Sequence, residues 1–393
     1  MDAVRRHRLS DLTRVDAETR GQIDYVPKAH EPRSSTVITF MAPDMASMSG
    51  GLQVIYRMAE HLKHLGFDAR VWHGTPGHHY DGFECDADVV TGRQIRLEPG
   101  DVLVMPEVGG SKWANLNSGA PVVMLVQGVD FVFANSEFSG STEHDYPGWP
   151  DARGAISVSE TIEEFLREVV PSDFPLYRVP LEIDADLYSP RTKEPLIAFM
   201  PRRRKEDLLG VIHLLRRSGA LDARWELLPI DGMSQAEVAH AMGRAAIFLN
   251  GGEREGFGLP GAEALAAGCH VIGFTGHGGR EYMRSDFADV IAESDVVDMA
   301  RTVRSSMAEF DEDQEAFRRR SERGRAFIIE NYGSQAQADA LSAAFTEILK
   351  SSAVLTQPVL ASHYQTHAPD SAAARAYVSL RTFAGRLRRS IAR

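Results

Sequence analysis

"EREGFGLPGAEALAAG", residues 253–268, is a glycine-bearing stretch with a glutamate near each end. The residues before it, "AAIFLN" (245–250), are mostly apolar and typical of a buried strand in a parallel sheet. The residues after the glycines favour a helix, because alanine and leucine dominate, Pro260 suits a first turn and Gly268 is a natural C-terminal stop. The stretch therefore predicts a strand, a glycine loop and a helix.

The two glutamates, Glu255 and Glu263, are predicted to lie in the loop and in the first helical turn or just beyond it. The first amides of a helix lack intrahelical partners and form an anion site, and glycines let a ligand approach the backbone. Carboxylates accept hydrogen bonds from hydroxyls. Amides flanked by two carboxylates suit a phosphate flanked by two polyols, as in a nucleotide sugar. Taken alone, the pair also fits a helix-dipole contact and an exposed loop charge.

Composition limits the possible functions. The chain has 393 residues, 43% hydrophobic and 25% charged, which suits a soluble protein of two domains. A net charge of −12 argues against nucleic-acid binding. The two cysteines, Cys85 and Cys269, suggest neither a disulfide framework nor a zinc site, and the histidines are scattered without metal-ligand spacing. With no membrane span or signal peptide in the pattern, we expect a cytoplasmic protein.

Strand and helix patterns alternate twice along the chain, which predicts an α/β protein with parallel sheets. After a polar lead-in (1–34), the first half (35–183) contains helices at 51–66 and 160–170 and strands at 36–41, 68–73, 101–106, 121–128, 131–136 and 154–159. A polar, proline-bearing linker (184–195) precedes the second half (196–352). A tail (353–393) ends the chain.

The second half is predicted to be trimmed. Only one strand–helix unit (225–245) separates its first helix from the strand at 246–250, fewer than a six-stranded nucleotide-binding half would hold. Ligands of such folds bind at the carboxyl ends of the strands, so we expect a cleft between the halves.

With these motifs in hand, the chain resembles the retaining glycosyltransferases of the GT-B fold, family four. The segment "EGFGLPGAEALAAGCHVIGF" carries the Glu-x7-Glu signature of that family, and "SGGLQVIYRMAEHLKHLGFDARVW" and "AISVSETIEEFL" match its first half. The resemblance implies two Rossmann-like domains that face a central cleft, and transfer of a sugar from a nucleoside diphosphate sugar to an acceptor hydroxyl with retention of configuration.

The resemblance also implies roles for the residues of the glycine stretch. Glu263 would bind the ribose hydroxyls of the nucleotide, and Glu255 the hydroxyls of the transferred sugar. Backbone amides around Phe257, Gly258 and Leu259 would approach the diphosphate and the sugar.

Other residues would complete the donor site. Gly50 and Gly51 would lie against the diphosphate from across the cleft, although such a pair also fits a plain helix-entry turn. Arg202, in "PRRRKED" (201–207), matches the diphosphate-binding arginine, and the lysine position falls on either Lys205 or Arg203. A charge run is often only a solvated face, but cations here would stabilise a leaving diphosphate without a metal.

The acceptor side departs from the family pattern. Where many members have a histidine, this chain has Gln127, which cannot take a proton at neutral pH. The resemblance implies that a leaving phosphate oxygen deprotonates the acceptor, so the mechanism does not need that histidine. Two Asp-x-Asp sequences, at 86–88 and 184–186, are weak metal motifs, and we expect neither a metal nor a cofactor.

Two alternatives to a glycosyltransferase remain open at this point. One is a catalytically degenerate GT-B scaffold or regulator, and the other is a glucan synthase or phosphorylase of the same fold. The expected partners are a nucleotide sugar donor and a glycan or lipid-linked acceptor. Acceptor specificity is expected from first-half loops such as 74–84 and 106–119, whose sequences do not indicate which acceptor binds.

The C-terminal segment 371–393 has six arginines and no acidic residue. At helical spacing its apolar residues fall on one side and most of its arginines on the other, which predicts a basic amphipathic helix that contacts an anionic membrane surface. Docking on the first domain, or fraying around Gly385, are the alternatives.

Overall fold

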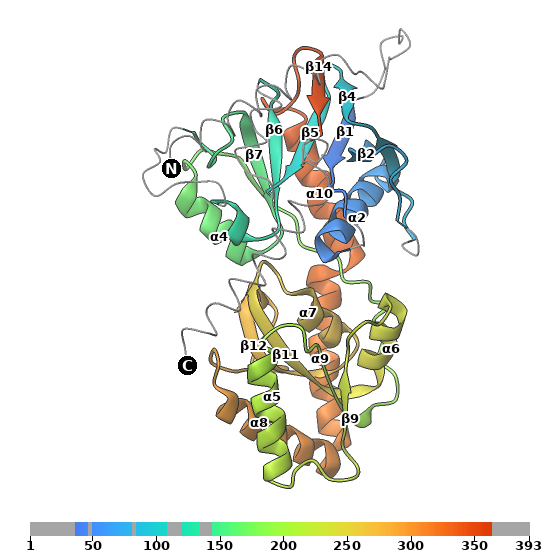
Figure 1. Ribbon diagram of the computed structural model, residues 1–393, viewed down its shortest axis with the longest axis vertical. Coiled ribbons are helices and arrows are strands. Elements are labelled where there is room, and N and C mark those ends of the chain that lie inside the picture. Colours follow the sequence, from blue (N-terminus) through green and yellow to red (C-terminus); the bar gives the residue numbers. More distant parts are fainter. Residues whose placement is uncertain (1–35, 46–48, 81–83, 108–118, 134–143, 364–393) are drawn as a thin grey trace, which may run out of the picture.

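The protein consists of two α/β halves stacked end to end (Figure 1). The computed structural model describes residues 36–45, 49–80, 84–107, 119–133 and 144–363. The predicted lead-in (1–34) and the predicted amphipathic helix (371–393) lie outside these residues. No helix in the described ranges combines the length and apolar character needed to cross a bilayer.

The first half is built on a parallel sheet of seven strands in the order β3-β2-β1-β5-β6-β7-β8. Its strands are β1 (Val37–Met41), β2 (Asp68–His73), β3 (Asp88–Thr91), β5 (Val102–Pro106), β6 (Val122–Val126), β7 (Ala152–Ser157) and β8 (Leu176–Arg178). The helices α2 (Gly50–His64) and α4 (Glu160–Val169) begin where Ser49 and Ser159 cap their first turns. Five of the six strands predicted for this half are confirmed, and β3 and β8 are not among the predicted strands.

The strand predicted at 131–136 is wrong over its described residues. A short 3-10 helix, η2 (Val129–Phe131), follows β6, and Phe133 is exposed. The run of aromatic and branched residues suggested a strand, but these residues follow the carboxyl end of β6, where the chain must turn.

The second half has a parallel sheet of five strands in the order β10-β9-β11-β12-β13, which confirms the trimmed half. The strands are β9 (Glu194–Phe199), β10 (Glu226–Pro229), β11 (Ala245–Glu255), β12 (His270–His277) and β13 (Ala288–Val290). Its helices are α5 (Lys205–Arg217), α6 (Gln235–Arg244), α7 (Leu259–Ala266), α8 (Val296–Glu312) and α9 (Gln314–Tyr332). A 3-10 turn, η3 (Gly278–Glu281), follows β12.

Strand β11 is longer than predicted, and Glu255 is its last residue instead of a loop residue. The strand continues because β12 pairs with it as far as His277, across a bulge between Gly252 and Glu255. The strand was predicted to end at residue 250, which would place Gly252 in the loop. In the structure, a Cβ at Gly252 would lie 2.8 Å from the Phe274 carbonyl oxygen of the neighbouring strand. The glycine permits close strand pairing and does not end the strand.

The chain then returns to the first half. Helix α10 (Ser334–Ile348) packs against α2 and β8 (Figure 1). Strand β14 (Val359–Ser362) pairs in antiparallel fashion with β4 (Gln94–Leu97), a strand that the sequence did not predict. The domain boundaries stay a prediction, but these contacts attach 334–362 to the half that precedes the linker.

Candidate active site

A cleft of about 580 Å³ lies between the two halves. In each sheet the chain order reverses once, between β1 and β5 in the first and between β9 and β11 in the second. The residues after the carboxyl ends of these four strands line the cleft, as expected for ligand sites in such sheets. Among the predicted site residues, the lining includes Gly50, Gly51, Gln127, Arg202, Arg203, Glu255, Phe257, Gly258, Leu259 and Glu263.

Two helix N-termini meet across this cleft. Helix α2 begins at Gly50 and helix α7 at Leu259, and a Cβ on Gly50 would lie 3.5 Å from Leu259 Cδ1. Both N-termini carry the positive end of a helix dipole. Two such ends in one cleft favour a ligand with two negative groups, such as a diphosphate.

Tyr282 contacts the glycine loop before α7 and holds its backbone in place. Gly258 has φ +90°, a left-handed conformation that suits glycine, and the Tyr282 hydroxyl donates to its carbonyl at 2.5 Å. A Cβ at Gly261 would lie 2.6 Å from the same hydroxyl oxygen. Phe257 is buried against Tyr282 and Tyr332, and its ring centroid lies 5.0 Å from that of each tyrosine. This packing fixes the backbone that faces the cleft.

Glu255 lies in the cleft beside an arginine. Its Oε1 atom is 2.9 Å from Nε of Arg203, and Arg203 also donates to the Glu253 carbonyl at 3.1 Å. Burial raises the pKa of Glu255, and the positive charge of Arg203 partly offsets that rise. The carboxylate is thus positioned to accept hydrogen bonds from hydroxyls of a ligand.

Glu263 lies one helical turn into α7 and lines the same cleft. Burial raises its pKa to about 7, against the effect of a hydrogen bond with the Tyr188 hydroxyl. A ligand hydroxyl that donates to this carboxylate would favour its charged form.

The three consecutive arginines have different environments. Arg202 is exposed and lines the cleft, whereas Arg203 contacts Glu255. Arg204 forms ion pairs with Asp207 and Glu293 and lies over the Phe274 ring, 4.8 Å from its centroid. Arg204 therefore anchors α5 to the sheet.

Lys205, the first residue of α5, is exposed and is not part of the cleft lining. Of the two candidates for the lysine position, Arg203 is the one in the cleft.

Gln127 joins the two sides of the site. Its Nε2 atom donates to the Gly51 carbonyl at 3.1 Å. A Cβ on Gly256, beside Glu255, would lie 1.9 Å from the Gln127 carbonyl oxygen. The halves are thus in direct contact at this point, and only glycine fits there.

Glu107 is a cleft residue that sequence reasoning missed. It directly follows β5, is 5% exposed and accepts hydrogen bonds from the backbone amides of Gln127 and Gly128. Burial raises its pKa to about 7, and these amides limit the rise. The sequence signal that could have identified Glu107 is a carboxylate immediately after the buried strand "VLVMP".

Comparison with known proteins identifies the fold. No family model matches the chain. An alpha-1,6-glucosyltransferase from Actinobacillus pleuropneumoniae serotype 7 (strain AP76) is 27% identical over 242 residues, 56% of this chain and 68% of that protein. Sucrose-phosphate synthase from Thermosynechococcus elongatus superimposes with a TM-score of 0.58 at 12% identity, covering 80% of this chain and 99% of that one.

Two further solved structures are similar. Anabaena HepE in complex with UDP and glucose gives a TM-score of 0.56 at 11% identity, over 79% of this chain and 100% of that one. Pneumococcal O-GlcNAc transferase GtfA in complex with UDP and GlcNAc gives 0.53 at 11% identity, over 81% and 99%. The chain therefore has the GT-B fold, with two Rossmann-like halves.

Proposed function

We propose that this protein is a retaining glycosyltransferase that moves a sugar from a nucleoside diphosphate sugar to an acceptor hydroxyl without a metal. The observation that carries the proposal is the position of Glu255 and Glu263, which line one cleft on either side of the N-terminus of α7. Amides between two carboxylates match a diphosphate between a ribose and a sugar. The similarity to a glucosyltransferase supports the same activity.

Each part of the cleft has a task in this proposal. Glu263 binds the ribose hydroxyls and Glu255 the hydroxyls of the transferred sugar. The diphosphate lies between the N-termini of α2 and α7, near Arg202 and Arg203. As the bond to the sugar breaks, negative charge grows on the diphosphate, and the guanidinium groups and helix dipoles stabilise it.

Retention of configuration follows from attack on the face that the leaving group vacates. The leaving phosphate oxygen takes the proton of the acceptor hydroxyl, so no protein base is needed at Gln127. Gln127 instead holds Gly51 and contributes hydrogen bonds on the acceptor side. A glycan or a lipid-linked glycan is the proposed acceptor class.

The first experiment is a donor panel with detection of released nucleotide. UDP-glucose and UDP-GlcNAc come first, because two solved proteins of similar fold hold UDP with glucose or GlcNAc. The wild type should hydrolyse or transfer from one donor, and NMR of the product should show the anomeric configuration of the donor. Nucleotide binding without turnover on any donor or acceptor would favour the scaffold alternative.

Membrane contact through 371–393 is part of the same proposal, since it would bring the cleft to a lipid-linked acceptor. Co-sedimentation with anionic vesicles should retain the full chain more than a version that ends at His363, which keeps the pairing of β14 with β4. If the vesicles retain both equally, or neither, the C-terminal segment does not anchor the protein.

A further inference from the structure

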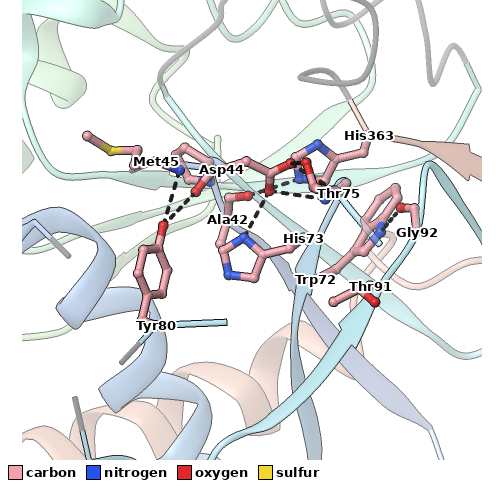
Figure 2. A network of polar contacts seen from close by, with 12 residues as sticks. Ala42, Asp44, Met45, Trp72, His73, Thr75, Tyr80, Thr91, Gly92 and His363 are labelled. Atoms are coloured by element: carbon pink, nitrogen blue, oxygen red, sulfur yellow. Dashed lines mark hydrogen bonds and ion pairs between the residues drawn. The ribbon is translucent and has the colours of Figure 1, made fainter. Parts of the chain in front are cut away.

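Two histidines and an aspartate meet on the first half, at the carboxyl ends of β1 and β2. Asp44 follows β1, His73 ends β2, and His78 lies in the segment after it. One ligand atom from each residue lies within 4.8 Å of the others. Figure 2 shows how Asp44 and His73 face each other, which follows from the parallel pairing of β1 with β2.

Several hydrogen bonds fix the orientation of the Asp44 carboxylate. His73 Nδ1 and the Thr75 hydroxyl donate to its oxygens at 3.0 and 2.7 Å. The amides of Gly74 and Thr75 donate to its two oxygens at 3.2 and 2.8 Å. A carboxylate fixed in this way is a ready ligand for a cation.

His73 is completely buried and has both ring nitrogens oriented. Nδ1 donates to Asp44 Oδ1 at 3.0 Å, and Nε2 then accepts from the Tyr56 hydroxyl at 2.8 Å. If a cation displaced the Nδ1 proton, the proton would move to Nε2, and Nε2 would donate to the Tyr56 oxygen instead. Tyr56 thus supports either tautomer, as outer partners of metal-bound histidines do.

His78 supplies the second, independent observation. Its Nε2 atom is buried and has no hydrogen-bond partner within the described residues. Its ring centroid lies 4.4 Å from that of His73, which brings its nitrogen close to the other two ligand atoms. A buried polar atom without a partner is unfavourable, and a bound cation would supply the missing partner.

We propose that Asp44, His73 and His78 form a binding site for a divalent transition metal, with Zn²⁺ as the best chemical match. Two imidazoles and a carboxylate are ligands that Zn²⁺ uses in proteins. Ligand atoms of a tetrahedral site lie roughly 3.3 Å apart for bonds of about 2.0 Å, so small rotations of these side chains complete the site. The neighbouring His363 donates through Nε2 to the Ala42 carbonyl at 2.9 Å.

The metal would join a cleft-lining segment of the first half to the segment that follows β2. Pro43 and Met45, on either side of Asp44, line the cleft, and the Met45 amide donates to the Tyr80 hydroxyl at 3.1 Å. A cation that binds Asp44 and His78 would fix 43–45 against 74–80. Asp44, His73 and His78 are not among the described residues that line the cleft, so the metal would order the acceptor side and take no part in the leaving-group chemistry.

The test uses tag-free, full-length protein treated with a chelator and then titrated with Zn²⁺ in a calorimeter, and with Co²⁺ in an absorption experiment. The wild type should bind one equivalent, and His78→Ala should weaken binding at least about 10-fold, since even outer partners of metal ligands contribute that much. The matched control is His79→Ala, which changes the adjacent exposed histidine and should bind like the wild type. Zn²⁺ should raise the Tm of the wild type and the control but not of His78→Ala.

Absence of saturable Zn²⁺ binding would overturn the proposal, and so would equal affinity in the wild type and His78→Ala. In either case the cluster is a hydrogen-bond network only. If circular dichroism shows that the His78→Ala variant is unfolded, Asp44→Asn is used in its place, because asparagine keeps the shape of the side chain. None of these measurements depends on sugar transfer.

Discussion

The two walls of the cleft are built in different ways. The proposed donor wall takes Glu255, Gly258 and Glu263 from the single stretch 253–268. The proposed acceptor wall takes Glu107 and Gln127 from the ends of two different strands, and residues near Asp44 from a third. A wall made by one strand–loop–helix unit can be recognised from local sequence, whereas a wall assembled from separate strands depends on the whole sheet.

The walls also hold their carboxylates differently. On the donor wall the Glu255 carboxylate forms an ion pair with Arg203. A bound ligand can take the place of either partner in that pair. On the acceptor wall, backbone amides hold Glu107, and no ligand is required to satisfy it. Substitutions on the donor wall should therefore change binding and rate, and those on the acceptor wall should change stability with pH.

The largest effect is expected at Glu255. Replacement by Gln should reduce turnover at least about 100-fold, because hydrogen bonds to the transferred sugar strengthen as the transition state forms. Nucleotide affinity, measured by calorimetry, should stay close to that of the wild type. Glu253→Gln, an exposed neighbour, is the control. Turnover near the wild-type level in Glu255→Gln would remove this residue from the site.

Arg202→Ala should lower both donor affinity and rate, with a loss in kcat/KM of roughly 100-fold, since charge on the diphosphate grows toward the transition state. Lys205→Ala provides the comparison, because Lys205 is exposed and does not line the cleft. Steady-state kinetics on both variants decides which cation acts. A larger loss in Lys205→Ala would reverse our preference for the cleft arginines.

Glu263→Ala should weaken binding of the nucleoside diphosphate by roughly 1–3 kcal/mol, the usual effect of losing charge-assisted hydrogen bonds. Calorimetric titration with the nucleotide alone measures this without any acceptor. Unchanged affinity in this variant would contradict the assignment to the ribose.

Glu107→Gln probes the acceptor wall through pH. With a pKa raised from 4.5 to about 7, the folded chain keeps a proton that the unfolded chain releases in that window. The contribution of Glu107 to the free energy of unfolding therefore falls as pH rises from about 4.5 to 7 and stays low above it. The variant should be more stable than the wild type at pH 8 by roughly 1–3 kcal/mol, with little gain at pH 4.5.

Urea denaturation at the two pH values measures this effect, with the exposed Glu226→Gln as the control. An equal change at both pH values would show that ionisation of Glu107 is not the cause.

The smallest effect is expected from EDTA, which should leave donor hydrolysis without acceptor unchanged at temperatures well below the Tm. In our proposal, guanidinium groups and helix dipoles stabilise the leaving diphosphate. Complete loss of activity that Mn²⁺ or Mg²⁺ restores would contradict this. A fall in Tm alone would instead be consistent with a metal at Asp44 and His78.

The sequence predicted those features that short-range geometry determines. The strand–loop–helix unit that carries Glu255 and Glu263, the trimmed second half and most first-half strands belong to this group. Glu107 was missed because its environment comes from the neighbouring strand. The pairing of β4 with β14 joins segments that are far apart in sequence, and Asp44 meets His73 only because β1 and β2 lie side by side.

The return of the chain to the first half has a consequence during synthesis. Phe40 of β1 packs on Phe345 of α10, with ring centroids 5.9 Å apart. Strand β4 pairs with β14, which is synthesised much later. A ribosome releases 184–333 before either partner exists. The half that is translated first is therefore finished last, and until then it exposes apolar surface to aggregation or to chaperones.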